Sequence, residues 1–189
     1  MTITKDVKLL EAKMRPGRLS KHGFLGPSEN LDSILADDKV LLDQLSVTHS
    51  ELASNIETII SIVMGQRQKD LKEWLKRQTR FPKLAEPNGI PQFNIHNLPN
   101  SNQGFLVGKL HVFIMQWRGF QECPWGCVVH TDWASIDFMI LNRESGEFFT
   151  GPGLAVHLIR EHHFFEGKET PFRVDPEKAI RVLEIPTSE

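Results

Sequence analysis

Two cysteines and two histidines in the second half of the chain have the types and the spacing of metal ligands. Cys123 and Cys127 are the only cysteines in the sequence, and they enclose the tripeptide Pro-Trp-Gly. Thirty residues after the second cysteine, His157 and His162 follow in a segment with helical character. Thiolate and imidazole donors supplied by a turn and a helix are typical of tetrahedral zinc sites. The sequence therefore predicts a zinc ion held by these four side chains.

Helix geometry sets a condition on the two histidines. Residues five apart on a regular α-helix point about 140° apart, whereas residues four apart point about 40° apart. His157 and His162 therefore converge only if the helix loosens in its last turn. His163 is the substitute ligand if that turn tightens differently, and His130, three residues after Cys127, could replace either histidine.

Two other interpretations of these residues stay open. In the first, the cysteines and histidines are packed among aromatic side chains and bind no metal, because free cysteine is often buried. In the second, His130 and Asp132, or His157 and Glu161, supply a ligand and a general base to a metal-dependent hydrolase. The segment from His157 to His162 does not match the HExxH order or the HxxEH order of zinc proteases.

The segment from Cys123 to His163 resembles a C2H2 zinc finger, in which a hairpin carries two cysteines and a packed helix carries Phe, Leu, His and His. The resemblance implies that Phe149 and Leu154 form a small core beneath the metal. It covers about a fifth of the chain. It departs from the finger pattern in one respect, since 29 residues separate Cys127 from His157, where about a dozen are usual.

The composition is that of an ordinary globular protein. The chain has 189 residues, of which 40% are hydrophobic and 24% are charged, and its formal net charge is −2. This length allows one well-buried core and is too short for two large domains. The slightly negative charge gives the whole protein no general attraction for polyanions.

One local run of positive charge keeps a nucleic-acid alternative open. Between residues 67 and 83 there are seven Lys or Arg residues against two Asp or Glu residues, a local charge of +5. Such runs usually form a solvated helix face. The segment 45–53 also resembles the turn and second helix of a helix-turn-helix, although 50–63 has no Lys or Arg. In this alternative, phosphate contacts are expected from Lys76, Arg77 and Arg80.

The sequence also bears on the cellular compartment. No stretch reaches the ~18 apolar residues that span a bilayer, and the first residues lack the apolar core of a secretion signal. We therefore expect a cytoplasmic protein without a membrane partner. In a reducing compartment, two closely spaced cysteines favour metal ligation or free thiols over a disulfide.

The first half of the sequence predicts helices. Apolar residues at spacings of three and four predict helices at 5–14, at 31–45 with a break near 36–38, and from 48 to about 75 with a break at Gly65. Thr48 and Glu51 match a capping box, which marks the start of the last of these helices.

The second half predicts a small antiparallel sheet followed by two helices. Strands are expected at 105–117, 128–130, 133–141 and 147–150, and helices at 154–165 and 176–183. The first strand is a nearly unbroken apolar, β-branched and aromatic run and is expected to be buried on both faces. Asp137 alternates with apolar residues and is expected on a solvated face. Pro152 suits the first turn of its helix, Gly167 the cap beyond that helix, and Asp175 the N-cap of the last.

Together these patterns predict an α+β fold, with an N-terminal helical layer packed on a small antiparallel sheet and a C-terminal helix next to the cysteine turn. We expect an irregular arm at 1–30, a helical region at 31–85 and a sheet and helix region with the zinc site at 103–189, all in one globular unit. Because the catalytic set is incomplete, the expected function is a binding or interaction module with a structural zinc site and a possible protein partner. The alternatives are a nucleic-acid-binding regulator and a metal-dependent hydrolase.

Overall fold

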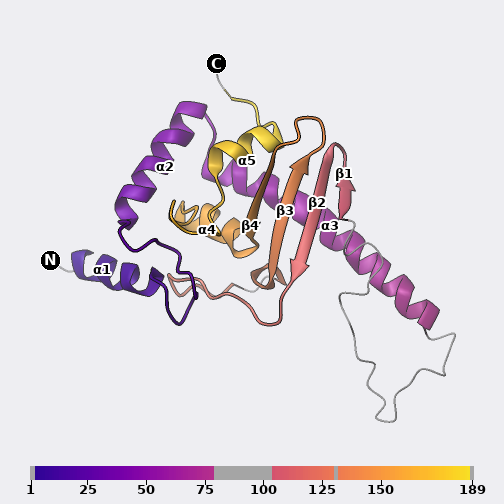
Figure 1. The fold of residues 1–189 in the computed structure, drawn as a ribbon, viewed down its shortest axis with the longest axis horizontal. Coiled ribbons are helices and arrows are strands. Elements are labelled where there is room, and N and C mark those ends of the chain that lie inside the picture. The colour runs from indigo at the N-terminus through magenta and orange to yellow at the C-terminus, as the bar shows by residue number, and fades with distance from the viewer. Residues whose placement is uncertain (1–2, 79–103, 130–131, 188–189) are drawn as a thin grey trace, which may run out of the picture.

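The computed structural model describes residues 3–78, 104–129 and 132–187. Five helices and a four-stranded antiparallel sheet lie within these residues, which confirms the predicted α+β class. The helices are α1 (Ile3–Met14), α2 (Leu31–Leu45), α3 (His49–Gln78), α4 (Leu154–His162) and α5 (Pro176–Leu183). The strands are β1 (Phe105–Val107), β2 (Leu110–Gln116), β3 (Ile136–Asn142) and β4 (Phe148–Pro152), in the order β1-β2-β3-β4. In Figure 1, α4 and α5 lie next to β4, and the end of α3 extends past β1.

The larger of two buried clusters lies between one face of the sheet and helices α2 to α5. Alternate residues of the two central strands point into it, among them Val112 of β2 and Ile140 of β3, which are directly paired and fully buried. Helix α3 contributes Ile56, Ile60 and Val63 at helical spacing. Residues of α4 and α5 complete the cluster. Alternate residues of the strands and residues three or four apart on the helix therefore pack into the same core.

The smaller buried cluster joins the N-terminal arm to the cysteine turn and to α4. It includes Phe24 and Leu25 of the arm, both fully buried, together with Cys123 and with Leu154 and Leu158 of α4. The region 15–30 has no regular secondary structure, as the pattern of Pro and Gly predicted. A hydrogen bond of 2.8 Å from the Gly167 amide to the Phe24 carbonyl fixes the arm to the segment after α4.

Two predicted helix caps are confirmed. The Glu51 amide donates to Thr48 Oγ1 at 3.1 Å, at the start of α3. The Lys178 amide donates to the Asp175 carboxylate at 2.9 Å, at the start of α5. These bonds satisfy amides that the helix itself leaves without partners.

The two predicted helix breaks are wrong. Helix α2 continues through 36–38, where Asp38 is buried and forms an ion pair with Arg173. Helix α3 continues past Gly65, where a side chain would meet only open space. Gly65 is therefore an exposed position that weakens the helix without ending it. Among the described helices, including the 30 residues of α3, none has both the length and the apolar character needed to cross a bilayer.

The predicted strands also need correction. The run from Phe105 to Trp117 forms two strands, because the chain turns at Gly108, whose φ of +58° favours glycine. Residues 128–129 are not a strand, and Asp132–Ser135 is a 3-10 helix that leads into β3. His130 lies outside the described residues.

The boundaries around α4 differ from the prediction as well. Pro152 ends β4 instead of opening the helix, and Gly153 is the N-cap. The helix ends at His162, and His163 takes the left-handed C-cap conformation that was assigned to Gly167. Glycine is the residue usually found in this conformation at a helix end, so a histidine there did not indicate that the helix ends.

Candidate metal centre

The cysteine turn is a short loop that points both sulfurs toward α4. The Gly126 amide donates to the Cys123 carbonyl at 2.9 Å, and Gly126 has a φ of +81°. A side chain at this position would be strained, which explains the glycine. Cys123 is buried in the smaller cluster, whereas Cys127 is exposed.

Helix α4 packs against both buried clusters, and this packing sets the positions of its histidines. Leu154 and Leu158 pack in the smaller cluster, while Ala155 and Ile159 pack in the larger one. The sequence of α4 is therefore apolar on two faces, and His157 is half-buried between them and the cysteine turn.

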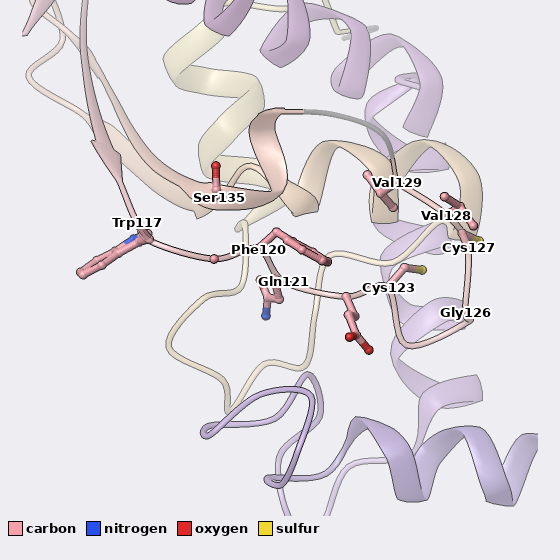
Figure 2. A pocket seen from close by; sticks show the side chains of 11 residues that line it. Trp117, Phe120, Gln121, Cys123, Gly126, Cys127, Val128, Val129 and Ser135 are labelled. Atoms are coloured by element: carbon pink, nitrogen blue, oxygen red, sulfur yellow. The ribbon is translucent and has the colours of Figure 1, made fainter. Parts of the chain in front are cut away.

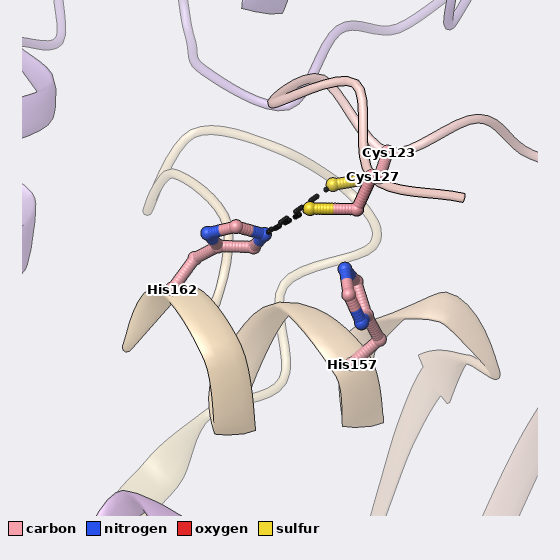
Figure 3. Close-up of side chains that lie close together, drawn as sticks. All are labelled: Cys123, Cys127, His157 and His162. Carbon is pink, nitrogen blue, oxygen red and sulfur yellow. Dashed lines mark hydrogen bonds between the residues drawn. The ribbon is translucent and has the colours of Figure 1, made fainter. Parts of the chain in front are cut away.

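The predicted convergence of the two histidines occurs at the end of the helix. His162 is the last helical residue, and the chain turns at His163 with amides donating back to the Ile159 and Leu158 carbonyls. Both histidines lie inside the helix, so no loosening of the last turn precedes His162, and the two imidazoles converge through their side-chain conformations. In Figure 3 both imidazoles extend from α4 toward the sulfurs.

The four donor atoms lie close enough to share one ion. One ligand atom from each of Cys123, Cys127, His157 and His162 lies within 4.8 Å of the others. His162 Nε2 is 3.5 Å from the Cys123 sulfur and 3.3 Å from the Cys127 sulfur. Bond lengths of about 2.3 Å to sulfur and 2.0 Å to nitrogen put S and N about 3.5 Å apart on a tetrahedron. Both distances therefore match the edge of a tetrahedral Cys2His2 site.

His157 provides a further test of the fit. Its Nε2 atom is buried and has no hydrogen-bond partner among the described residues. A buried polar atom without a partner costs about 1–3 kcal/mol. A metal ion bonded to this imidazole would remove that cost, so the residues present fit a bound cation.

Burial sets the protonation of the donors. It lowers the pKa of His157 and of His162, which keeps both imidazoles neutral and able to donate a lone pair near pH 7. Burial raises the pKa of the Cys123 thiol, and hydrogen bonds from the amides of Trp125 and Cys127 act in the opposite direction. Those amides would stabilise the thiolate that a metal requires.

Trp125 positions one of the ligands, and sequence reasoning missed this role. Its ring stacks on His162 with centroids 4.0 Å apart and an interplanar angle of 2°. The edge of Phe164 packs against the same indole at 5.5 Å. Stacking on Trp125, a residue of the cysteine turn, therefore fixes the orientation of the His162 ring. In the sequence, the tryptophan between the two cysteines was the residue that could have indicated this role.

The other predicted site residues are not brought into the cluster by the described structure. His163 stacks on His49 with centroids 4.4 Å apart, so its ring is directed elsewhere. His130 lies outside the described residues. Glu161, the carboxylate of the hydrolase alternative, is exposed and is not a member of the donor group. Of the two residues from the resemblance, Leu154 packs with Cys123, whereas Phe149 belongs to the larger cluster.

A groove of about 780 Å³ adjoins the cysteine turn, and Figure 2 shows the side chains that line it. It runs from Trp117 past Phe120 to Cys127 and Val128. Phe120 and Val128 are 74% and 75% exposed. This groove could not be predicted from the sequence, because residues 117–129 lie in irregular structure, where alternation of apolar and polar residues does not separate buried from exposed positions.

The basic run of the nucleic-acid alternative is only partly described. Lys76 is exposed near the end of α3. The side chain of Arg77, and all of Arg80, lie outside the described residues. Arg67, at the start of the run, is partly buried and donates to Gln116 Oε1 at 3.5 Å. At least one of these cations therefore contacts the sheet.

Comparison of the chain with protein family models, with curated proteins and with solved structures gives no match.

Proposed function

We propose that this protein is a non-enzymatic interaction module whose Cys123, Cys127, His157 and His162 side chains hold one structural zinc ion. The observation that carries the proposal is the tetrahedral edge formed by His162 Nε2 and the two sulfurs, at 3.5 and 3.3 Å. Two thiolates and two neutral imidazoles are the donor set that zinc prefers in structural sites.

The donor count favours a structural role over hydrolysis. A catalytic zinc site keeps one coordination position for water or substrate, whereas structural sites use four protein ligands. Here four protein donors are close together, and Glu161 offers no carboxylate at the site. When bound, the ion would tie the cysteine turn to the end of α4, and both elements pack in the smaller cluster with the N-terminal arm.

Metal analysis of the purified, tag-free protein tests the proposal. We expect one zinc per chain and less than one tenth of that amount in the Cys127→Ser variant. Because Cys127 is exposed, its loss should leave the folded core intact. His163→Gln is the matched control, since it changes the adjacent histidine outside the donor group and should keep the metal. Metal-free wild-type protein, or full zinc in Cys127→Ser, would overturn the proposal.

A further inference from the structure

The face of the sheet opposite the larger cluster carries apolar side chains. We call it the outer face and define it by the outward-pointing strand residues Leu106, His111, Phe113, Met115, Asp137, Met139, Leu141, Phe148 and Thr150. All of them are exposed or half-buried, and none belongs to either buried cluster of the described residues. Six of the nine are large and apolar. Contiguous apolar patches of this kind mark interaction sites.

The strand register makes the outer face continuous. Leu106, His111, Leu141 and Phe148 form one row across all four strands. Phe113 and Met139 pair directly in the next row. Leu106 is 64% and Phe148 is 45% exposed, so the row is open at both edges of the sheet. Neighbouring side chains within each row touch, and they form one apolar surface.

The outer face has one carboxylate and no cation at its outward strand positions. The carboxylate, Asp137, was expected to be solvated, but it is half-buried and accepts a hydrogen bond from Trp117 Nε1 at 2.7 Å. Asp137 therefore already has a hydrogen-bond donor within its own chain. No Lys or Arg lies along these strands, although Lys178 of α5 places its Nζ 4.8 Å from the centre of the Phe148 ring at the β4 edge. Over the central rows, an anionic partner would lose hydration without gaining a cation.

We propose that the outer face is a self-association surface, on which a second copy of this chain packs sheet against sheet about a two-fold axis. A two-fold contact places the same patch on both sides, so an apolar face with no unpaired charge is complementary to itself. Antiparallel sheets pack in this way at about −30°, with their side chains interdigitating. The second copy would thus supply the layer that the described helices supply on the inner face.

The position of Asp137 is compatible with this dimer. The central pair of the outer face is Phe113 and Met139, at the middle of the register between β2 and β3. An axis near this pair leaves Asp137 two residues, or about 7 Å, from the axis. The two carboxylates would then lie about 14 Å apart, too far for direct contact with each other.

The size of the face predicts a weak dimer. At about 3.4 Å per residue and 4.8 Å between strands, the four strands cover roughly 350 Å² of flat area per copy. Trp117, which is 54% exposed and donates to Asp137, adds to it at one end. The two copies together therefore cover about 700 Å² of flat area, which is below the roughly 1,000 Å² of a stable specific interface and fits a weak, transient contact. We expect a dissociation constant between about 1 and 100 μM.

Sedimentation velocity between about 1 and 300 μM tests the proposal on the whole, metal-loaded protein. The wild type should change from monomer to dimer over this range, and Met115→Lys should weaken the dimer at least tenfold. Met115 is 53% exposed, so the substitution buries no charge in the monomer. Val40→Lys on α2 and Ile62→Lys on α3 are matched controls, since these side chains are 55% and 51% exposed away from the outer face. Both should dimerise as the wild type does.

A second variant tests the same surface independently, in case Met115→Lys does not fold. Leu106→Lys lies on the edge strand β1, where 64% exposure leaves little packing to lose, and it should also weaken the dimer. A wild type that stays monomeric at 300 μM, or dimers that survive both outer-face variants, would overturn the proposal. Equal weakening by Val40→Lys would overturn it too. None of these residues touches the metal donors, so zinc content should stay the same in every variant, and a failure here is distinct from a failure of the proposed zinc site.

Discussion

At the scale of single residues, the candidate metal centre depends on side chains that hold the ligands as well as on the ligands. Trp125 stacks on His162, and the amides of Trp125 and Cys127 hydrogen-bond to the Cys123 sulfur. Such neighbours orient ligands, and removing one typically lowers metal affinity 10- to 100-fold. The short turn therefore supplies two donors and also the support for a third.

We expect Trp125→Ala to weaken zinc binding by about tenfold or more, because His162 loses the ring that holds it in plane. Competition with a chromophoric zinc chelator would measure the change. Phe120→Ala is the control, since Phe120 lies in the same irregular segment but is 74% exposed and stacks on no metal ligand among the described residues. Equal zinc affinity in wild type and Trp125→Ala would show that the stacking has no positioning role.

Glu166 gives the protein a predictable pH dependence. Burial raises its pKa to about 8, and its Oε1 atom has no hydrogen-bond partner among the described residues. The unfolded chain releases this proton near pH 4.5, whereas the folded chain keeps it until about pH 8. The unfolded state therefore binds fewer protons between these values, and stability contributed by this group is lost as pH rises through that window.

Glu166→Gln should remove this loss, since an amide keeps the shape of the carboxyl without its charge. We expect the free energy of unfolding to rise by about 1–3 kcal/mol at pH 8.5 relative to wild type, and by much less at pH 4.5. Denaturant unfolding at the two pH values measures the difference. The same stability change at both pH values would mean that Glu166 is not buried in its neutral form.

At the scale of helices and strands, the position of α2 depends on one buried ion pair. Asp38 and Arg173 form this pair with side chains only 2% and 13% exposed. Next to it, Asp37 pairs with Lys168 at 2.5 Å, but these side chains are 58% and 52% exposed. Breaking a buried pair leaves an uncompensated charge, whereas an exposed pair contributes little.

Asp38→Ala should therefore destabilise the protein by about 3 kcal/mol, and Asp37→Ala by less than about 1 kcal/mol. Urea denaturation followed by circular dichroism gives both values. The two positions are adjacent in the same helix, so the comparison controls for helix propensity. Similar losses for both variants would argue against a structural role for the buried pair.

The same pair shows what the sequence could and could not predict. Periodicity identified α2, α5 and the sheet region, because apolar spacing is a local signal. It could not show that Asp38 has a cation 135 residues away, and a helix break was predicted near 36–38. Likewise, Gly108 and Lys109 lie within the otherwise mostly apolar run from Phe105 to Trp117, and this pair was not taken as a turn. Only the φ of +58° in the fold reveals it.

The candidate site was more predictable than these boundaries. Cysteine and histidine are rare enough that their spacing alone indicated the four donors, which the structure places within 4.8 Å of one another. The stacking of Trp125 and the capping role of His163 were not predictable, because both depend on where α4 ends. Helix ends are set by tertiary contacts more than by propensity.

At the scale of the whole molecule, the two buried clusters differ in how they depend on a metal. The ion would stabilise the smaller cluster, whereas the larger cluster would fold without it. Cys123 belongs to the smaller cluster, with the arm and one face of α4. The larger cluster contains the inner face of the sheet and no metal donor. A zinc ion would therefore stiffen one side of the protein and would not hold the entire fold.

Removal of the metal, or Cys123→Ser, should accordingly lower the melting temperature without complete unfolding. Hydrogen exchange should become faster in the cysteine turn and in the arm around Phe24. It should stay slow in β2 and β3, whose inner residues lie in the larger cluster. Complete unfolding of the metal-free protein would contradict the separation of the two clusters, and so would a melting curve that does not move.

The most direct test of the central claim is X-ray absorption spectroscopy at the zinc edge of the purified protein. We expect four-coordinate zinc with two sulfur neighbours at about 2.3 Å and two imidazole nitrogens at about 2.0 Å. A His157→Ala variant should show one nitrogen replaced by a solvent oxygen, or should lose the ion. A spectrum without sulfur neighbours, or a protein that takes up no zinc, would contradict the claim that Cys123, Cys127, His157 and His162 form a metal site.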